Sequence, residues 1–258
     1  INNIKIISFK KLSKLIENKD HYNLIKIIND LYNGDFYIIR GALKKKYINY
    51  LQESLHNYSV HNQSSFYKMK ENCPNFWRSI DDNVSYKYAF KAVKEAFYFF
   101  RWNKEKYKLW KNFNKIWSYL KFLGGKDFKS FVSNTPKDHV VDRIQIVRYP
   151  EKTGYCELHS HPPNNQRLII SIYMSEILKD YQSGGTYFIK SNKKLKVENK
   201  IKKGDVGIFY STLKHGVDSV KLNKKQRKKI YPGRWWCGLY SPASDHKKKR
   251  LTSKPQRI

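Results

Sequence analysis

Apolar side chains recur every three or four residues in three stretches of the first half of the chain, and this spacing predicts amphipathic helices. The stretch 4–31 divides near 18–20 into two helices, the stretch 43–55 forms one, and the stretch 88–122 forms two that are broken around 101–103. A short run rich in β-forming residues covers 36–40, and turn-forming residues are scattered through 56–88. The pattern therefore predicts a helical region with one short strand and one long structured loop.

Beyond Gly124 and Gly125 the pattern changes to short apolar runs separated by turn signals. The expected strands cover 140–149, 168–174, 185–189, 206–210 and 235–240. Many short strands with turns between them are typical of a barrel or jelly roll. We therefore expect an α+β fold in three parts: a helical N-terminal region over 1–135, a β-barrel core over 136–245 against which it packs, and a basic C-terminal tail over 246–258.

The chain is long enough to bury a substantial core, with 258 residues of which 40% are hydrophobic. It is also strongly basic, because 52 lysines and arginines outnumber 21 aspartates and glutamates and give a net charge of +31. Two interpretations of this charge stay open. It is either a general compositional bias toward solvated lysine or a functional basic surface for an anionic partner.

The three cysteines form no CxxC pair and no zinc spacing, which favours a reducing compartment. No apolar run approaches the length of a membrane span, and the first residues do not build the apolar region of a signal peptide. We expect a cytoplasmic protein without a membrane span.

Three histidines stand where two distant strands of such a barrel would meet. His159 and His161 are separated by one residue and so share one face of a strand, while His215 follows a strand that Gly204 and Asp205 introduce. Imidazole suits ferrous iron, and three protein ligands leave positions open for small molecules. The pattern predicts an iron centre.

The motifs around these histidines form an ordered series that resembles the iron(II)- and 2-oxoglutarate (2OG)-dependent oxygenases, and their prolyl-hydroxylase-like members in particular. The series over about 140–242 is RYP at 148–150, HSH at 159–161, GGTYF at 184–188, KGD at 203–205, HGV at 215–217 and GRW at 233–235. The resemblance implies a double-stranded β-helix, of the jelly-roll or cupin type, that uses iron(II), 2OG as cosubstrate and dioxygen.

Two further residues receive roles in binding 2OG. A guanidinium group binds a carboxylate through two parallel hydrogen bonds, so Arg234, on the strand after the distal histidine, is the expected anchor for the distal carboxylate of 2OG. By resemblance, Tyr149 hydrogen-bonds the same cosubstrate.

The chain departs from the family at His161, because the family has aspartate or glutamate at this position. Three interpretations stay open. His161 is itself a ligand, as in three-histidine cupins; or Glu157, two residues before His159 and on the same strand face, supplies the carboxylate; or the carboxylate is absent and a halide or water takes its place, as in 2OG-dependent halogenases. Glu157 also suits a role in orienting a histidine.

The resemblance implies a dioxygenase that hydroxylates an unactivated C–H bond of a small substrate and releases succinate and carbon dioxide. The positive charge favours an anionic substrate over a cationic one. The alternatives are a three-histidine dioxygenase without cosubstrate, a 2OG-dependent halogenase and, as a non-enzyme, a basic nucleic-acid-binding protein on a decayed barrel. The three histidines argue against the last.

Overall fold

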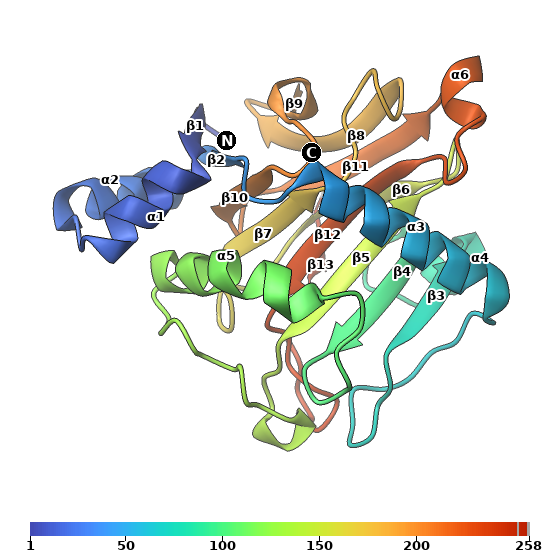
Figure 1. Cartoon of the computed structure of the whole chain (residues 1–258), viewed down its shortest axis with the longest axis horizontal. Helices are drawn as coiled ribbons and strands as arrows, with labels where there is room; N and C mark the ends of the chain where they lie inside the picture. The colour runs from blue at the N-terminus through green and yellow to red at the C-terminus, as the bar shows by residue number, and fades with distance from the viewer. Residues whose placement is uncertain (252, 257–258) are drawn as a thin grey trace.

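Two β-sheets that share one strand form the centre of the fold (Figure 1), a computed structural model that describes residues 1–251 and 253–256. Residues 252 and 257–258 of the predicted basic tail lie outside the described residues. The large sheet has the order β3-β4-β5-β12-β7-β10-β2-β1. Its strands are β1 (Ile4–Ser8), β2 (Phe36–Arg40), β3 (Phe76–Ile80), β4 (Ala92–Phe100), β5 (Arg143–Tyr149), β7 (Leu168–Tyr173), β10 (Val206–Tyr210) and β12 (Arg234–Tyr240).

The small sheet faces the large one and has the order β4-β6-β11-β8-β9, with β13 beside β6. Its strands are β6 (Tyr155–Ser160), β8 (Ser183–Lys190), β9 (Lys193–Lys196), β11 (His215–Lys221) and β13 (Lys254–Pro255). Strand β4 belongs to both sheets, because 95–100 pair with β5 whereas Ala92 and Val93 pair with β6. This arrangement confirms the expected jelly roll, or double-stranded β-helix.

Helices α3 and α5 lie across the outer face of the large sheet (Figure 1). Their buried side chains, among them Leu51 and Trp117, join one core cluster with Ile146 of β5 and Trp235 of β12. The helices are α1 (Phe9–Glu17), α2 (His21–Tyr32), α3 (Lys45–His61), α4 (Asp82–Ser85), α5 (Leu109–Leu123) and α6 (Lys224–Arg227), with short 3-10 turns η1 (Pro136–Asp138) and η2 (Glu198–Lys200). No helix in the described part of the chain has the length and apolar character needed to cross a bilayer.

A second cluster closes one end of the space between the sheets. Phe36, Phe188 and Phe209 are fully buried there, with the ring centroid of Phe188 4.8 Å from that of Phe209 and 5.4 Å from that of Phe36. Aromatic rings at these separations pack as they do in protein cores. These rings fill one end of the space between the sheets. The histidines lie next to this cluster, toward the unfilled part of that space.

Within the expected helical stretches, helices form over 9–17, 21–32, 45–61 and 109–123, but other parts of the prediction for the first half were wrong. Residues 88–100 contain strand β4 rather than a helix, Ile4–Ser8 form β1, and the expected loop over 56–88 contains β3, α4 and the end of α3. Strand β4 lies inside the sheet and is buried on both faces, so its apolar residues lack the alternation of a half-exposed strand. These apolar residues happen to recur every three or four positions, which is the spacing expected of an amphipathic helix.

Candidate metal centre

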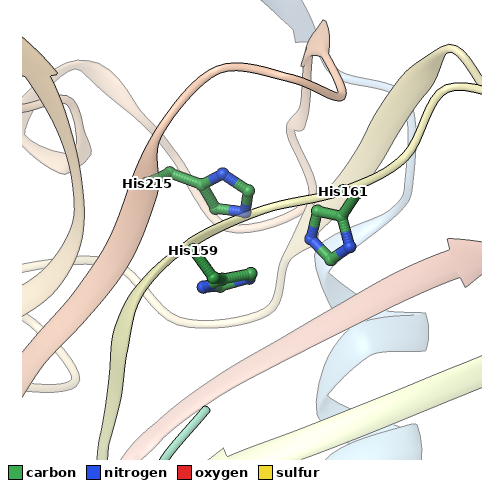
Figure 2. A group of neighbouring side chains, drawn as sticks. All are labelled: His159, His161 and His215. Atoms are coloured by element: carbon green, nitrogen blue, oxygen red, sulfur yellow. The ribbon is translucent and has the colours of Figure 1, made fainter. Parts of the chain in front are cut away.

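Three histidine side chains meet on the inner face of the small sheet. His159 in β6 lies directly opposite His215, the first residue of β11, and His161 follows the end of β6. The ligand atoms of the three lie within 4.8 Å of one another, and Figure 2 shows the rings gathered around one space. The ring centroids of His159 and His215 are 4.3 Å apart, and His161 lies 4.8 Å from His159 and 5.2 Å from His215.

Hydrogen bonds at Nδ1 orient the rings and leave Nε2 free for a metal. Nδ1 of His159 lies 2.8 Å from the carbonyl oxygen of Glu157, and Nδ1 of His215 lies 2.8 Å from that of Leu213. A carbonyl oxygen only accepts, so each Nδ1 carries the proton and each Nε2 presents its lone pair. This is the arrangement in which metal-bound histidines are usually held.

His161 shows the same arrangement with a different partner. Its Nδ1 lies 2.6 Å from the hydroxyl oxygen of Ser253, in the C-terminal segment that pairs with β6 through β13. Its Nε2 is buried with no hydrogen-bond partner among the described residues. A buried nitrogen without a partner is costly unless something binds it, and a metal ion at this position would satisfy it.

The surroundings of the three histidines favour their neutral form. Burial, together with neighbouring imidazoles, holds the pKa of His159 and His161 well below the usual range, and burial lowers the pKa of His215 to about 4. Metals bind the neutral imidazole, so the environment keeps all three residues in the form that binds iron.

The structure does not bring Glu157 to the histidines. His215 lies opposite His159 while Val217 lies opposite Cys156, so β6 carries one more residue than β11 in this interval. Such a bulge interrupts the alternation of side chains, and Cys156 rather than Glu157 faces the cavity with His159. The carboxylate of Glu157 instead accepts a hydrogen bond of 2.8 Å from the backbone amide of Lys91. The expectation of a shared face with His159 was therefore wrong.

A cavity of about 530 Å³ lies between the sheets and contains the three histidines in one wall. The opposite wall belongs to the large sheet and includes Tyr149 and Arg234, which are paired across β5 and β12. The space is within the size range of sites for small molecules. The structure thus brings five of the six predicted site residues to one cavity.

Arg234 is almost fully buried, at 1% exposure, and already has an acidic partner. Its Nε lies 2.9 Å and 3.0 Å from the two carboxylate oxygens of Glu198, and its Nη2 lies 2.5 Å from Glu198 and 2.8 Å from the hydroxyl of Thr186. Glu198 also accepts hydrogen bonds from the Thr186 amide and the Tyr181 hydroxyl. The sequence interpretation missed Glu198, although it is the only acidic residue within the lysine-rich stretch 190–204.

Two hydrogen-bonding groups beside this ion pair remain unfilled. Nη1 of Arg234 and the hydroxyl of Tyr173 are buried without a well-formed hydrogen bond to any residue that the structure describes. The Tyr173 ring lies 5.9 Å from the guanidinium carbon of Arg234, and the Tyr149 ring lies 5.3 Å from it. A carboxylate would accept from both unfilled groups. Tyr173 was missed because, within an apolar strand, it resembles a core residue.

Ser253→Ala should weaken metal binding through His161, although Ser253 does not touch the metal position. Loss of the partner at Nδ1 frees the ring to rotate, and removal of such supporting hydrogen bonds costs about 10- to 100-fold in metal affinity. Titration of iron(II) against a chromophoric chelator measures the change, and Ser253→Thr, which keeps the hydroxyl, is the control. Equal affinity in wild type and Ser253→Ala would show that the tail does not orient His161.

Comparisons with known proteins concern the fold. No protein-family model matches the chain, and no curated protein matches it in sequence. JOX2, solved in complex with 2OG, Fe and JA, superposes with a TM-score of 0.53 at 13% identity, covering 94% of this chain and 77% of JOX2. A prolyl-4-hydroxylase from Pseudomonas putida gives 0.51 at 11% identity, covering 84% and 98% of the two chains.

A full-length protein from Neurospora crassa, solved in complex with alpha-KG, gives a TM-score of 0.53 at 9% identity, covering 94% of this chain and 86% of the other. All three alignments extend over most of this chain. The chain therefore shares the double-stranded β-helix fold of these structures.

Proposed function

We propose that this chain is a non-haem iron(II)- and 2OG-dependent oxygenase that hydroxylates an unactivated C–H bond of a small substrate and releases succinate and carbon dioxide. The observation that carries the proposal is one cavity with unfilled polar groups on both walls. Three imidazoles offer Nε2 atoms on one wall, and Arg234 lines the other with an unfilled Nη1, behind which the Tyr173 hydroxyl is buried without a partner among the described residues. The complexes of JOX2 with 2OG and of the Neurospora crassa protein with alpha-KG support the proposal.

His159, His161 and His215 would hold the iron through Nε2. Three neutral nitrogen ligands leave open coordination positions for 2OG and dioxygen. When bound, iron(II) with 2OG supplies dioxygen activation and the oxidising power for the C–H bond. The phenyl ring of Phe90 stacks on His159 with centroids 4.2 Å apart, and Phe209 lies 4.8 Å from the ring of His215. These apolar contacts hold the rings in place and exclude water.

Arg234 and Tyr173 would receive the distal carboxylate of 2OG. Glu198 fixes the guanidinium from its other side and balances its charge, so that Nη1 stays aimed without moving when the cosubstrate enters. Groups that are already oriented bind more strongly because less conformational freedom is lost on binding. The ion pair between Glu198 and Arg234 would thus hold the guanidinium in position for the cosubstrate.

Anaerobic loading of the purified chain with iron(II) and 2OG tests the proposal. We expect a visible charge-transfer absorption that requires both components, and succinate release once air is admitted. Iron(II) alone and zinc(II) with 2OG are the controls, and both should lack the band. A protein that binds iron but shows no band with 2OG would contradict the proposed cosubstrate.

The three-histidine dioxygenase without cosubstrate remains the second candidate, because Glu198 already occupies most of the hydrogen-bonding capacity of Arg234. It predicts dioxygen uptake with substrate alone. A 2OG-dependent halogenase is disfavoured, since His161 lies where the halide would bind. A chloride-dependent product mass distinguishes that reaction from hydroxylation.

A further inference from the structure

The cavity wall carries more positive charge than the proposed cosubstrate requires. Six basic residues line the cavity, and none of its described lining residues is acidic. They are Lys87, Lys94, Arg143, Arg234, Lys247 and Arg250. Arg234 pairs with Glu198 and Arg250 with Asp245, while Lys87 and Lys247 are exposed to solvent at the rim. Lys94 and Arg143 remain, inside the cavity.

These two cations are partly buried, and neither has a compensating acid among the described residues. Arg143 donates to the amide oxygen of Gln145 at 2.9 Å, and its Nε is buried with no partner in the described chain. No acidic side chain among residues 1–251 and 253–256 forms an ion pair with Lys94 or Arg143. Burial lowers the pKa of both groups. Because a charge removed from water is costly unless it is paired, both are expected to be completed by a ligand.

The fold directs both side chains to the same space. Tyr98 and Gln145 are paired across β4 and β5 and both line the cavity, so strand alternation places Lys94 and Arg143 on this inner face too. Lys94 lies at the metal end, because the register of β4 with β5 sets it level with Tyr149 and Ala92, two residues earlier, pairs with Cys156 of β6. Arg143 lies toward the mouth, 5.3 Å from the ring of Tyr98 and 5.7 Å from that of Tyr240. The two cations thus lie toward opposite ends of this inner face.

Arg143 is too far along the strand to serve the proposed cosubstrate site. It begins β5, whereas Tyr149, which is paired with Arg234, ends the strand. Six residues of a strand span roughly 20 Å. A 2OG molecule held between the histidines and Arg234 would lie at the other end of β5, which leaves the Arg143 guanidinium available to a second ligand.

We propose that the cavity takes an anionic substrate whose carboxylate or phosphate group is bound by Arg143, with Lys94 as a second, more distant positive charge. As a statement about substrate class, this rests on the proposed oxygenase function. The guanidinium fork supplies directed donors, the ammonium of Lys94 supplies a second charge nearer the histidines, and the rings of Tyr98 and Tyr240 flank the guanidinium. The rest of the substrate then lies between this anion site and the iron.

Isothermal titration with three matched probes tests the anion site on the full chain. Phenylacetate and phenyl phosphate carry the proposed anionic groups, whereas phenylacetamide has a similar shape without charge. We expect either anion to bind at least about 10-fold more tightly than the amide, because hydrogen bonds to charged groups are stronger than neutral ones. The tighter of the two anions identifies the group.

Amino-acid substitutions test which residues produce the preference for anions over the neutral amide. Arg143→Leu should reduce anion affinity by about 10- to 100-fold and leave amide binding unchanged, whereas Lys94→Met, which removes the more distant charge, should reduce anion affinity by a smaller factor. Arg143→Lys, which keeps the charge but not the fork, should lie between Arg143→Leu and wild type. Lys26→Met, which removes an exposed charge from α2, is the control and should bind as wild type does. If Arg143→Leu fails to fold, Lys94→Met and Arg143→Lys carry the comparison.

Titrations of metal-free protein and of protein with iron(II) and saturating 2OG under anaerobic conditions separate this proposal from the proposed function. Anion binding that persists in 2OG supports a distinct site. Equal affinity for the amide, selectivity unchanged in both variants, or complete competition by 2OG would overturn it. Failure of the oxygenase proposal shows instead as a missing charge-transfer band, which these titrations do not use.

Discussion

His161→Ala should remove iron from the protein, whereas Glu157→Ala should leave iron binding intact. The structure places His161 in the histidine group with a buried, unfilled Nε2, and places the Glu157 carboxylate on the amide of Lys91. Two remaining imidazoles bind iron far more weakly than three, so the loss should exceed the roughly 100-fold that follows removal of a supporting hydrogen bond. Metal analysis after anaerobic loading and desalting measures the bound iron.

Two further variants sharpen this test. His61→Ala removes an exposed imidazole from α3 and should retain full iron content. His161→Asp rebuilds the motif common in the oxygenase family and should bind iron, because a carboxylate suits the same facial position. Iron retained in His161→Ala but lost in Glu157→Ala would reverse the assignment.

Arg234→Met should destabilise the protein and also weaken 2OG binding, for two separable reasons. The substitution leaves Glu198 as a buried carboxylate without its cation, and breaking such a pair costs about 3–5 kcal/mol of unfolding free energy. It also removes the Nη1 donor proposed for 2OG, which should weaken cosubstrate affinity by about 100-fold. Denaturant unfolding and titration of the charge-transfer band measure the two effects.

The double variant Arg234→Met with Glu198→Gln separates them. Glutamine keeps an acceptor for the Thr186 amide and carries no charge, so the double variant should regain part of the lost stability. It should not regain 2OG affinity, since the guanidinium is still absent. Wild-type 2OG affinity in either variant would leave Arg234 a structural role only and would favour the dioxygenase without cosubstrate.

The spacing of apolar residues was enough to predict those helices and strands that have the same surroundings along their whole length. Helices α1, α2, α3 and α5 each bury one stripe against the sheet, and a single buried stripe produces the three- and four-residue spacing directly. Strand β10 matched the expected 206–210, because turns bound it on both sides. Strand β4 could not be recognised in this way, since its two faces are buried by different partners.

In the candidate site, too, local features could be predicted from the sequence, whereas features that depend on strand pairing could not. The spacing of His159 and His161 and the distant His215 were enough to predict a metal centre, because the chemistry of imidazole and the period of a strand are local properties. The role of Glu157 was decided by a bulge, which depends on the register between β6 and β11. Register is a property of two strands and is not written in either one alone.

The sequence by itself determined the kinds of groups at this site: imidazoles for a metal, a guanidinium for a carboxylate, and a surplus of positive charge. Only the tertiary structure decided their partners. It joined Glu198 to Arg234 across 36 residues, brought Ser253 to His161 across 92, and left Lys94 and Arg143 without an acid inside the cavity. The fold decides which groups lie beside each buried charge. A buried charge next to an opposite charge is stabilised within the protein, whereas a buried charge without such a neighbour is costly until a ligand binds it.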